Sequence, residues 1–288
     1  MNCPICSSKQ NKRKYKIEKF VVIECPKCGL IRLDHDFSFD KVKKLYKKQY
    51  FNNPVFSIGY IDYAATERSL RLNFLKRAKR ISRSVGEKQI RLLDVGTSTG
   101  YFISECSKLN IIAEGIELSE EAVDFARSRL KLTVFKSALE DFRGKKQYDV
   151  ISAWDVIEHS SDPNKFLKKV NSLLVENGKF FFTTGDVQSV CSKLSGKRWH
   201  LFNLPDHLFF YSKGTITKLL KKNKFVVKSI TYPWNYYELG YLIERFLKKV
   251  VGLKNVKLIK FLAYNFISRN IIIPFNLFDI MEVEAIKK

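Results

Sequence analysis

The sequence of 288 residues lacks any uninterrupted apolar run of the roughly 18 to 20 residues that a membrane-spanning helix needs. The longest candidate, residues 261–278, is interrupted by Arg269, Asn270 and Pro274. A signal peptide is also missing, because residues 1–4 lead straight into a cysteine motif. These absences predict a cytoplasmic protein. Internal repeats and low-complexity segments are absent as well.

Acidic side chains are scarce. The chain carries 29 Asp and Glu against 52 Lys and Arg, a formal net charge of +23. Such a charge is typical of proteins that bind nucleic acid or an anionic membrane surface. It is equally typical of a chain with a general lysine bias, and the lysines here are scattered over every segment. Charge alone therefore does not assign a partner.

Cysteine is sparse too, but four of the six residues form a pattern. Two C-x-x-C pairs, Cys3 with Cys6 and Cys25 with Cys28, are spaced as in four-cysteine zinc sites. Four thiolates close a tetrahedral site and leave no position open for water, so the predicted Zn²⁺ is structural. Two disulfides are the alternative, which a cytoplasmic chain disfavours. The basic and strand-like residues between the pairs predict a small zinc ribbon.

A strand, a glycine-bracketed turn and a helix start follow one another between residues 90 and 102. The apolar run 90–95 predicts a strand buried in a parallel sheet, and Gly96 and Gly100 bracket the turn. Glycine lets a ligand approach the backbone, and the first N–H groups of a helix are unpaired. An acidic residue for ribose hydroxyls is expected about twenty residues further on, and Glu117 ends the next strand. The stretch predicts a cradle for a polar ligand.

The acidic residue Asp94 before this turn, and the spacing Gly-x-Ser-x-Gly, distinguish the turn from the dinucleotide fingerprint. The pattern resembles the cofactor loop of class I S-adenosylmethionine-dependent methyltransferases, Asp-x-Gly-x-Gly-x-Gly, with Ser98 at the middle glycine. The resemblance implies that Asp94 holds the methionine end of the cofactor and that Glu117 holds the ribose. It implies further cofactor contacts from Gly96, Thr97, Ser98, Gly100, Tyr101, Phe102, Leu118, Ala138, Leu139, Trp154 and Tyr63.

Strand and helix patterns alternate through the rest of the chain, which predicts an α/β fold with a parallel sheet. The resemblance implies a Rossmann-like sheet of seven strands, mostly parallel with an antiparallel last strand, and helices on both faces. The predicted organisation is a zinc ribbon (1–36), a helical lid or linker (37–80), a methyltransferase core (81–234), a helical insertion (235–270) and a final core strand (271–288).

Histidine is rare, and three of the four residues lie in or beside the predicted cleft: His159, His200 and His207. His159 follows the fourth predicted strand, and His207 belongs to the long segment after the fifth, with Asp206 beside it. Ligands of open α/β sheets bind at these strand ends, and imidazole accepts protons near neutral pH. His207, His159 and Asp206 are therefore candidate catalytic residues; the alternative is a structural, hydrogen-bonded histidine.

The segments 155–159 and 205–212 resemble a branch of small-molecule methyltransferases, which includes ubiquinone-type O-methyltransferases and zinc-bearing C-methyltransferases of deoxysugars. In the sugar enzymes a histidine of a Glu-His pair after strand five is regarded as the base. His207 matches that histidine, and Asp206 stands at the glutamate. The resemblance covers residues 1–232, but the long C-terminal domain of the sugar enzymes has no counterpart here. It implies a sugar-like small-molecule acceptor, free or linked to a nucleotide or lipid.

Two other functions remain open from the residues. A zinc ribbon on a basic chain also suits an RNA methyltransferase, although the Asn/Asp-Pro-Pro-aromatic motif and a Pro-Cys pair are absent. A non-catalytic zinc-ribbon binding module is the second. Residues 245–260 interleave basic and apolar side chains, which predicts an amphipathic helix on the protein core or on an anionic inner membrane surface. Co-sedimentation with liposomes of varied charge distinguishes the two. The sequence does not set the oligomeric state.

Overall fold

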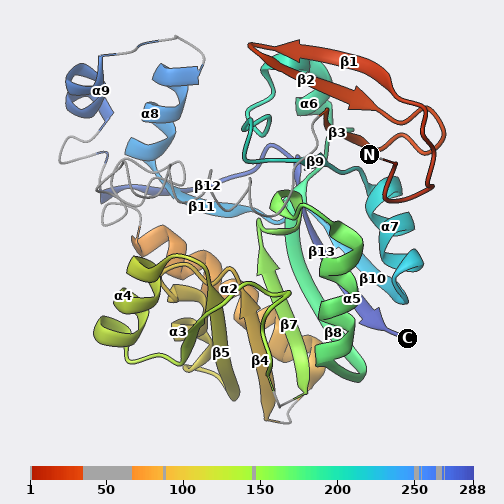
Figure 1. The fold of residues 1–288 in the computed structure, drawn as a ribbon. Coiled ribbons are helices and arrows are strands. Elements are labelled where there is room, and N and C mark those ends of the chain that lie inside the picture. The colour runs from red at the N-terminus through yellow and green to blue at the C-terminus, as the bar shows by residue number, and fades with distance from the viewer. Residues whose placement is uncertain are drawn as a thin grey trace.

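The structure is a computed structural model that describes residues 2–34, 67–86, 89–144, 147–249, 253, 255–263, 268 and 270–288. A seven-stranded sheet lies at its centre (Figure 1). Its strands are β4 (Ile90–Val95), β5 (Ile111–Glu117), β6 (Val134–Lys136), β7 (Tyr148–Trp154), β8 (Leu174–Gly185), β10 (Phe225–Thr231) and β13 (Ile280–Lys287). Their order is β10-β13-β8-β7-β4-β5-β6. The pairs among β4 to β8 are parallel, and β13 is antiparallel to both neighbours. The predicted fold class is confirmed.

Helices cover both faces of this sheet (Figure 1). They are α2 (Glu67–Val85), α3 (Tyr101–Cys106), α4 (Glu120–Leu130), α5 (Pro163–Leu173) and α7 (Lys213–Lys222). Strand β8 shows the two faces in its sequence: Phe181 packs in the cluster with α2, α3 and α4, whereas Phe180 and Phe182 pack with α5 and α7. The alternation follows from the two-residue period of a strand. Apolar side chains on both faces of a strand are typical of a central parallel sheet.

Local sequence signals set several helix starts. Ser119 caps α4 by accepting a hydrogen bond from the Ala122 N–H, and Asp162 caps α5 directly before Pro163. Ser212 and Thr215 form a reciprocal capping box at α7. Each cap satisfies backbone N–H groups that a helix start leaves unpaired. These caps set the residues at which α4, α5 and α7 begin.

A second sheet contains the cysteine motifs. It comprises β1 (Lys12–Ile17), β2 (Phe20–Glu24), β3 (Ile31–Leu33) and β9 (Phe209–Phe210), in that order and antiparallel throughout. The first three strands form the ribbon that the sequence predicts. The fourth, β9, comes from the segment that follows β8, far away in the chain. The ribbon is therefore joined to that segment by main-chain hydrogen bonds.

The C-terminal insertion differs from the prediction of an all-helical segment. It opens with strand β11 (Asn235–Glu238), continues with α8 (Leu239–Lys249) and α9 (Val256–Ala263), and is followed by β12 (Ile272–Phe275), which pairs with β11. The side chain of Asn73 on α2 donates to the Tyr236 carbonyl (2.8 Å) and accepts from its N–H (2.7 Å), which holds β11 in extended form. The closing segment correspondingly contains two strands, β12 and β13. The segment after β8, expected to be irregular, includes α6 (Val190–Ser195).

Two expectations stay untested. Residues 37–66, the first part of the predicted lid, lie outside the described residues. On α8 and α9, Phe246 and Phe261 are 56% and 77% exposed, which is compatible with the membrane-surface prediction but does not test it. Among the helices described, none is long and apolar enough to cross a membrane.

Candidate functional site

The turn after β4 has the backbone that its glycines predict. Gly96 (φ +70°) and Gly100 (φ +83°) are left-handed, and a Cβ at either position would lie within 2.8 Å of Val156 or Leu132. Ser98, at the position of the middle glycine, is also left-handed (φ +51°). A non-glycine residue in that conformation destabilises the fold by about 1–2 kcal/mol. The turn nevertheless has the same left-handed backbone at Ser98 as at its two glycines.

Glu117 holds this turn from the end of β5. One carboxylate oxygen accepts the Ser98 N–H (2.9 Å), and the other accepts the N–H groups of Leu118 (2.7 Å) and Ser119 (2.9 Å). Burial raises the pKa of Glu117, and these three hydrogen bonds oppose that shift. A carboxylate offers about four acceptor positions, so one position remains for a ligand hydroxyl. Glu117 thus shapes the turn, a contribution that the sequence did not predict.

Asp94 lies buried inside β4, where its carboxylate accepts a hydrogen bond from Ser152 Oγ (2.6 Å). Burial raises its pKa to about 7, although Ser152 and the charge of Arg77 act in the opposite direction. A carboxylate that loses so much hydration is stabilised by a cation. This side chain therefore fits the ammonium group of an amino-acid ligand.

Arg77 on α2 completes this end of the site, and the sequence reasoning did not find it. Its guanidinium lies over the Trp154 ring at 4.5 Å, and Trp154 in turn meets Phe102 edge-on at 5.1 Å. In the part of the chain that is described, Trp154 Nε1 is buried without a hydrogen-bond partner. Arg77 Nε also lacks a hydrogen bond, but it forms an ion pair with the buried Glu282 carboxylate at 3.8 Å. Buried donors beside a buried carboxylate fit a zwitterionic group, as at the methionine end of S-adenosylmethionine.

The other predicted cofactor contacts lie around the same strand ends. Ala138 and Leu139 are buried just after β6, next to Ser137, whose N–H donates to the Glu117 carbonyl (3.0 Å). Tyr101 and Phe102 are buried at the start of α3, Phe102 within the core cluster, whereas Leu118 is exposed. Thr97 is buried in the turn. Tyr63 lies outside the described residues.

His159 and His207 meet at the predicted cleft. Their ring centroids are 4.7 Å apart and the rings are edge-on (87°). His159 Nδ1 bonds to the Asp206 carbonyl (2.9 Å), and His207 Nδ1 bonds to the Leu201 carbonyl (2.8 Å). Because a carbonyl only accepts, each Nδ1 carries the proton of the neutral ring, and Nε2 of His207 carries the lone pair. The structure thus brings the two candidate bases together.

Burial shifts the pKa values of the histidine pair and of Glu158 toward their neutral forms. Burial and the neighbouring His159 lower the pKa of His207 to about 3, and burial lowers the pKa of His159. Glu158 is 3% exposed, and burial with the charge of Asp155 raises its pKa to about 8. The pair is therefore neutral at physiological pH. Asp206 contributes its main-chain carbonyl, while its carboxylate accepts from Asn203 Nδ2 (3.3 Å).

His200, the third predicted histidine, belongs to a different cluster with Cys191 and Asp279. Arg245 Nη2 lies 3.3 Å from His200 Nδ1, and arginine only donates, so Nδ1 accepts. Nε2 therefore carries the proton and donates to Asp279 (2.7 Å), which also accepts from Trp199 Nε1 (2.9 Å). This cluster is a hydrogen-bond network that ties α8 to the segment after β8.

Asp155 is a further residue that the sequence did not single out. It follows β7 with a left-handed backbone (φ +56°), which is uncommon outside glycine. Thr183 supports it twice, accepting from its N–H (2.9 Å) and donating to its carboxylate (2.8 Å). Strained residues held in this way cluster at functional sites. The left-handed backbone is what sets Asp155 apart from other aspartates, and residue type does not predict that conformation.

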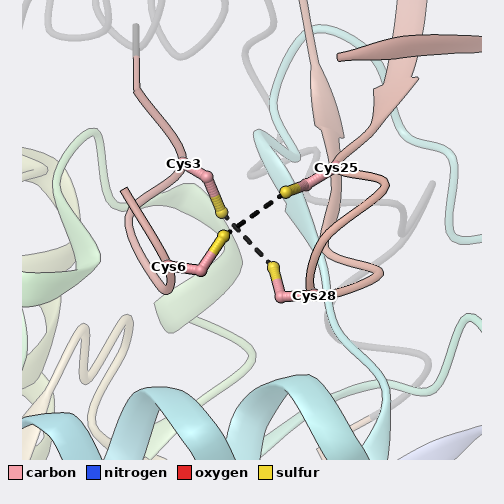
Figure 2. A group of neighbouring side chains, drawn as sticks. All are labelled: Cys3, Cys6, Cys25 and Cys28. Carbon is pink, nitrogen blue, oxygen red and sulfur yellow. Dashed lines mark hydrogen bonds between the residues drawn. The ribbon is translucent and has the colours of Figure 1, made fainter. Parts of the chain in front are cut away.

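The four predicted metal ligands converge on one point (Figure 2). Cys3 Sγ lies 3.4 Å from Cys28 Sγ, and Cys6 Sγ lies 3.5 Å from Cys25 Sγ. All four sulfurs are within 4.8 Å of one another and none forms a disulfide. Zn–S bonds of about 2.3 Å place the sulfurs of a tetrahedral site about 3.8 Å apart, so the residues fit Zn²⁺. Burial raises the pKa of Cys3 and of Cys28, whereas hydrogen bonds from the Cys28 backbone and from Cys6 outweigh burial at Cys25 and lower its pKa to about 7.

Comparison with known proteins decides the family. Residues 65–230 match the family described as methyltransferase domain. The chain belongs to this family. It is 27% identical over 174 residues to the ubiquinone biosynthesis O-methyltransferase of Pelagibacter ubique (strain HTCC1062). This alignment covers 57% of this chain and 72% of the relative. The enzyme of the same name from Vibrio vulnificus (strain YJ016) is 25% identical over 175 residues, 56% of this chain and 72% of the relative.

Solved structures share the fold. Magnesium protoporphyrin IX methyltransferase from Synechocystis PCC 6803, with bound SAH, has a TM-score of 0.55 at 12% identity and covers 87% of this chain and 100% of its own. The 1,6-didemethyltoxoflavin-N1-methyltransferase of Burkholderia thailandensis has a TM-score of 0.54 at 12% identity, over 96% and 99%. With the site above, the protein is an S-adenosylmethionine-dependent methyltransferase acting on a small molecule. Neither the RNA enzyme nor the non-catalytic module is favoured.

Cofactor affinity should depend on pH through Asp94. Its pKa in the empty site is about 7, and the cofactor ammonium needs the ionised form. Affinity should therefore rise with pH, and S-adenosylhomocysteine should bind about tenfold more weakly at pH 6 than at pH 8. Calorimetric titration at the two pH values measures this. Asp94→Asn should bind weakly and equally at both; an unchanged pH dependence in that variant would assign the titration to another group.

Proposed function

We propose that this methyltransferase methylates a hydroxyl oxygen of a sugar-like small molecule, with His207 as general base. The observation that carries the proposal is the His159–His207 pair, with rings 4.7 Å apart at the ends of β7 and of the segment after β8. Ligands of open α/β sheets react at this edge. The low pKa of His207 keeps its ring neutral, so Nε2 holds a lone pair throughout physiological pH.

Each part of the site has a distinct task. Asp94 and Arg77 hold the ammonium and carboxylate of the cofactor's methionine part, and Glu117 fixes the glycine turn and takes a ribose hydroxyl. S-adenosylmethionine, when bound, supplies a methyl group already activated by its sulfonium. The protein contributes mainly position, because methyl transfer is an in-line displacement between two oriented groups. His207 takes the proton of the acceptor oxygen as the new carbon–oxygen bond forms.

The pKa of His207 favours oxygen over carbon as the methylated atom. As an alcohol oxygen bonds to the methyl group its proton becomes strongly acidic, so a neutral but weakly basic imidazole can accept that proton within the transfer step. Removing a proton from carbon beside a ketone must precede transfer and needs a far stronger base, since proton transfer follows the difference in pKa. The relatives named O-methyltransferases support the same choice.

The sugar-like acceptor rests on a narrower basis. The four-cysteine ribbon and the segment 205–212 resemble those of the deoxysugar enzymes, whereas the relatives' names refer to ubiquinone biosynthesis. A peripheral contact with an anionic membrane, which would suit a lipid-linked acceptor, stays a proposal supported by the exposed Phe246 and Phe261.

An acceptor screen tests the proposed function. The protein is incubated with methyl-labelled S-adenosylmethionine and a panel of nucleotide-sugars, phenols, ketosugars and amines. We expect label on a nucleotide-sugar, with a methyl resonance in the product that NMR assigns to an ether. Methyl transfer to carbon or nitrogen would contradict the oxygen assignment. Transfer to phenols only would retain the reaction type and overturn the sugar-like acceptor.

A further inference from the structure

We propose that the zinc ribbon positions the His207 segment, so that the metal controls the acceptor side of the site and leaves the cofactor side intact. The inference rests on the proposed role of His207 for its catalytic consequence only. Its structural part concerns three groups: the four cysteines, the last ribbon strand β3, and β9, which begins two residues after His207.

Strand β9 is the fourth strand of the ribbon sheet. Ile31 pairs with Phe210 and Arg32 with Phe209, and both phenylalanines are buried. Strand β3 begins three residues after Cys28, and the Cys25 N–H donates to the Leu30 carbonyl (2.9 Å) within the second C-x-x-C turn. The path from a metal ligand to β9 is therefore short and consists of main-chain hydrogen bonds.

Leu208 connects this path to the cleft. The Leu33 N–H donates to the Leu208 carbonyl (2.9 Å), and the Leu208 N–H donates to the Glu158 carbonyl (2.9 Å) in the 3₁₀ turn Ile157–His159 that follows β7. Leu208 is thus held from one side by the ribbon and from the other by the turn that carries His159. His207, one residue earlier, has its own bonds to the carbonyls of Asn203 (N–H, 2.9 Å) and Leu201 (Nδ1, 2.8 Å), and the two Leu208 bonds fix the main chain directly after it. Leu33 and Leu208 are positioning residues, since both act through His207.

The first C-x-x-C turn is anchored to the core independently. The Pro4 carbonyl, between Cys3 and Cys6, accepts from Asn164 Nδ2 on α5 (2.9 Å) and from Lys222 Nζ on α7 (2.6 Å). A metal that joins the two cysteine pairs therefore links these core helices to β3 and β9. Without the metal, β3 and β9 lose that link.

The cofactor side is held by other bonds. Glu117 is fixed by the N–H groups of Ser98, Leu118 and Ser119, and Asp94 by Ser152. All of these come from β4, β5 and β7 or the turns that follow them, and none from the ribbon. Loss of the metal should therefore loosen the His207 segment and leave cofactor affinity unchanged, whereas a general loss of fold would change both.

The first experiment removes the metal from the full chain with a chelator and restores it with Zn²⁺. Amide hydrogen exchange at residues 208–210 should become at least about tenfold faster. Without the metal, β9 can separate from β3 at a lower free-energy cost, and exchange follows such local opening. Binding of S-adenosylhomocysteine, measured by calorimetry, should be unchanged, and Zn²⁺ should restore the slow exchange. Unchanged exchange would overturn the inference, and so would cofactor binding lost in parallel.

The second experiment keeps all four cysteines. Leu33→Pro removes the N–H that bonds to Leu208, and the control Leu33→Ala removes the same side chain but keeps that N–H. We expect faster exchange at residues 208–210 and lower acceptor kcat/KM in Leu33→Pro than in Leu33→Ala, with equal zinc content and cofactor affinity. Equal behaviour of the two variants would overturn the inference. If Leu33→Pro does not fold, the chelation experiment decides alone.

The two proposals fail in different ways. If His207 is not the base, His207→Asn keeps wild-type turnover, but exchange at residues 208–210 still responds to the metal. If the ribbon does not position the segment, His207 variants lose activity while exchange ignores the metal.

Discussion

Replacing His207 by asparagine is expected to lower turnover of the acceptor by about 10²- to 10⁴-fold, the range for loss of a general base. The asparagine Nδ2 can still donate to the Leu201 carbonyl, as Nδ1 of the histidine does (2.8 Å). The basic Nε2 has no equivalent in asparagine. The substitution therefore removes the proton acceptor with the least disturbance of its surroundings. Steady-state kinetics with the acceptor found in the screen measure the effect.

His159→Asn is the matched control, because its amide can likewise donate to the Asp206 carbonyl. If His207 is the base, this variant should lose much less activity than His207→Asn. Both variants should bind S-adenosylhomocysteine as the wild-type protein does. The hydrogen bonds that hold Asp94 and Glu117 come from Ser152 and from the N–H groups of Ser98, Leu118 and Ser119. Wild-type turnover in His207→Asn would remove His207 from the mechanism.

Replacing Glu117 by alanine should abolish tight cofactor binding. The carboxylate accepts three main-chain N–H groups, including that of the left-handed Ser98. Hydrogen bonds to a charged group contribute about 1.5–3 kcal/mol each, and their loss leaves the N–H groups without acceptors. We expect the affinity for S-adenosylhomocysteine to fall at least about 100-fold, because both the turn and the ribose contact are lost. Calorimetry measures the change.

Glu117→Gln separates the two contributions. The amide oxygen can still accept from Leu118 and Ser119, but the NH₂ group then faces the Ser98 N–H, donor against donor. Its affinity should lie between those of wild type and Glu117→Ala. An alanine variant that binds as tightly as wild type would show that Glu117 neither shapes the turn nor holds the cofactor.

The central sheet could be predicted because its signals are local. The apolar run 90–95 matches the observed bounds of β4, Ile90–Val95, and the turn bracketed by Gly96 and Gly100 is predicted from neighbouring residues alone. Strand β11 could not be predicted in this way, because the side chain of Asn73 on α2 satisfies its backbone. The pairing of β3 with β9 joins residues that are far apart in the chain, and no local pattern indicates it.

The candidate site divides in the same way. His159 and His207 could be predicted to lie at one edge of the sheet, because both follow the carboxyl ends of strands. Arg77 could not be distinguished from the other arginines of α2, because only the packing shows which of them lies over Trp154. Asp206 was a candidate catalytic residue because it stands beside His207, and the structure shows its main-chain carbonyl bonded to His159. Main-chain roles leave no trace in residue type.

The most direct test of this account is a calorimetric titration of the purified, zinc-loaded chain with S-adenosylhomocysteine at pH 8. Saturable binding of one ligand per chain is the expected result, because Asp94, Arg77 and Glu117 are the residues proposed to bind a single zwitterionic nucleoside. A folded protein that releases or absorbs no heat on titration, and whose thermal unfolding the ligand leaves unchanged, would contradict it.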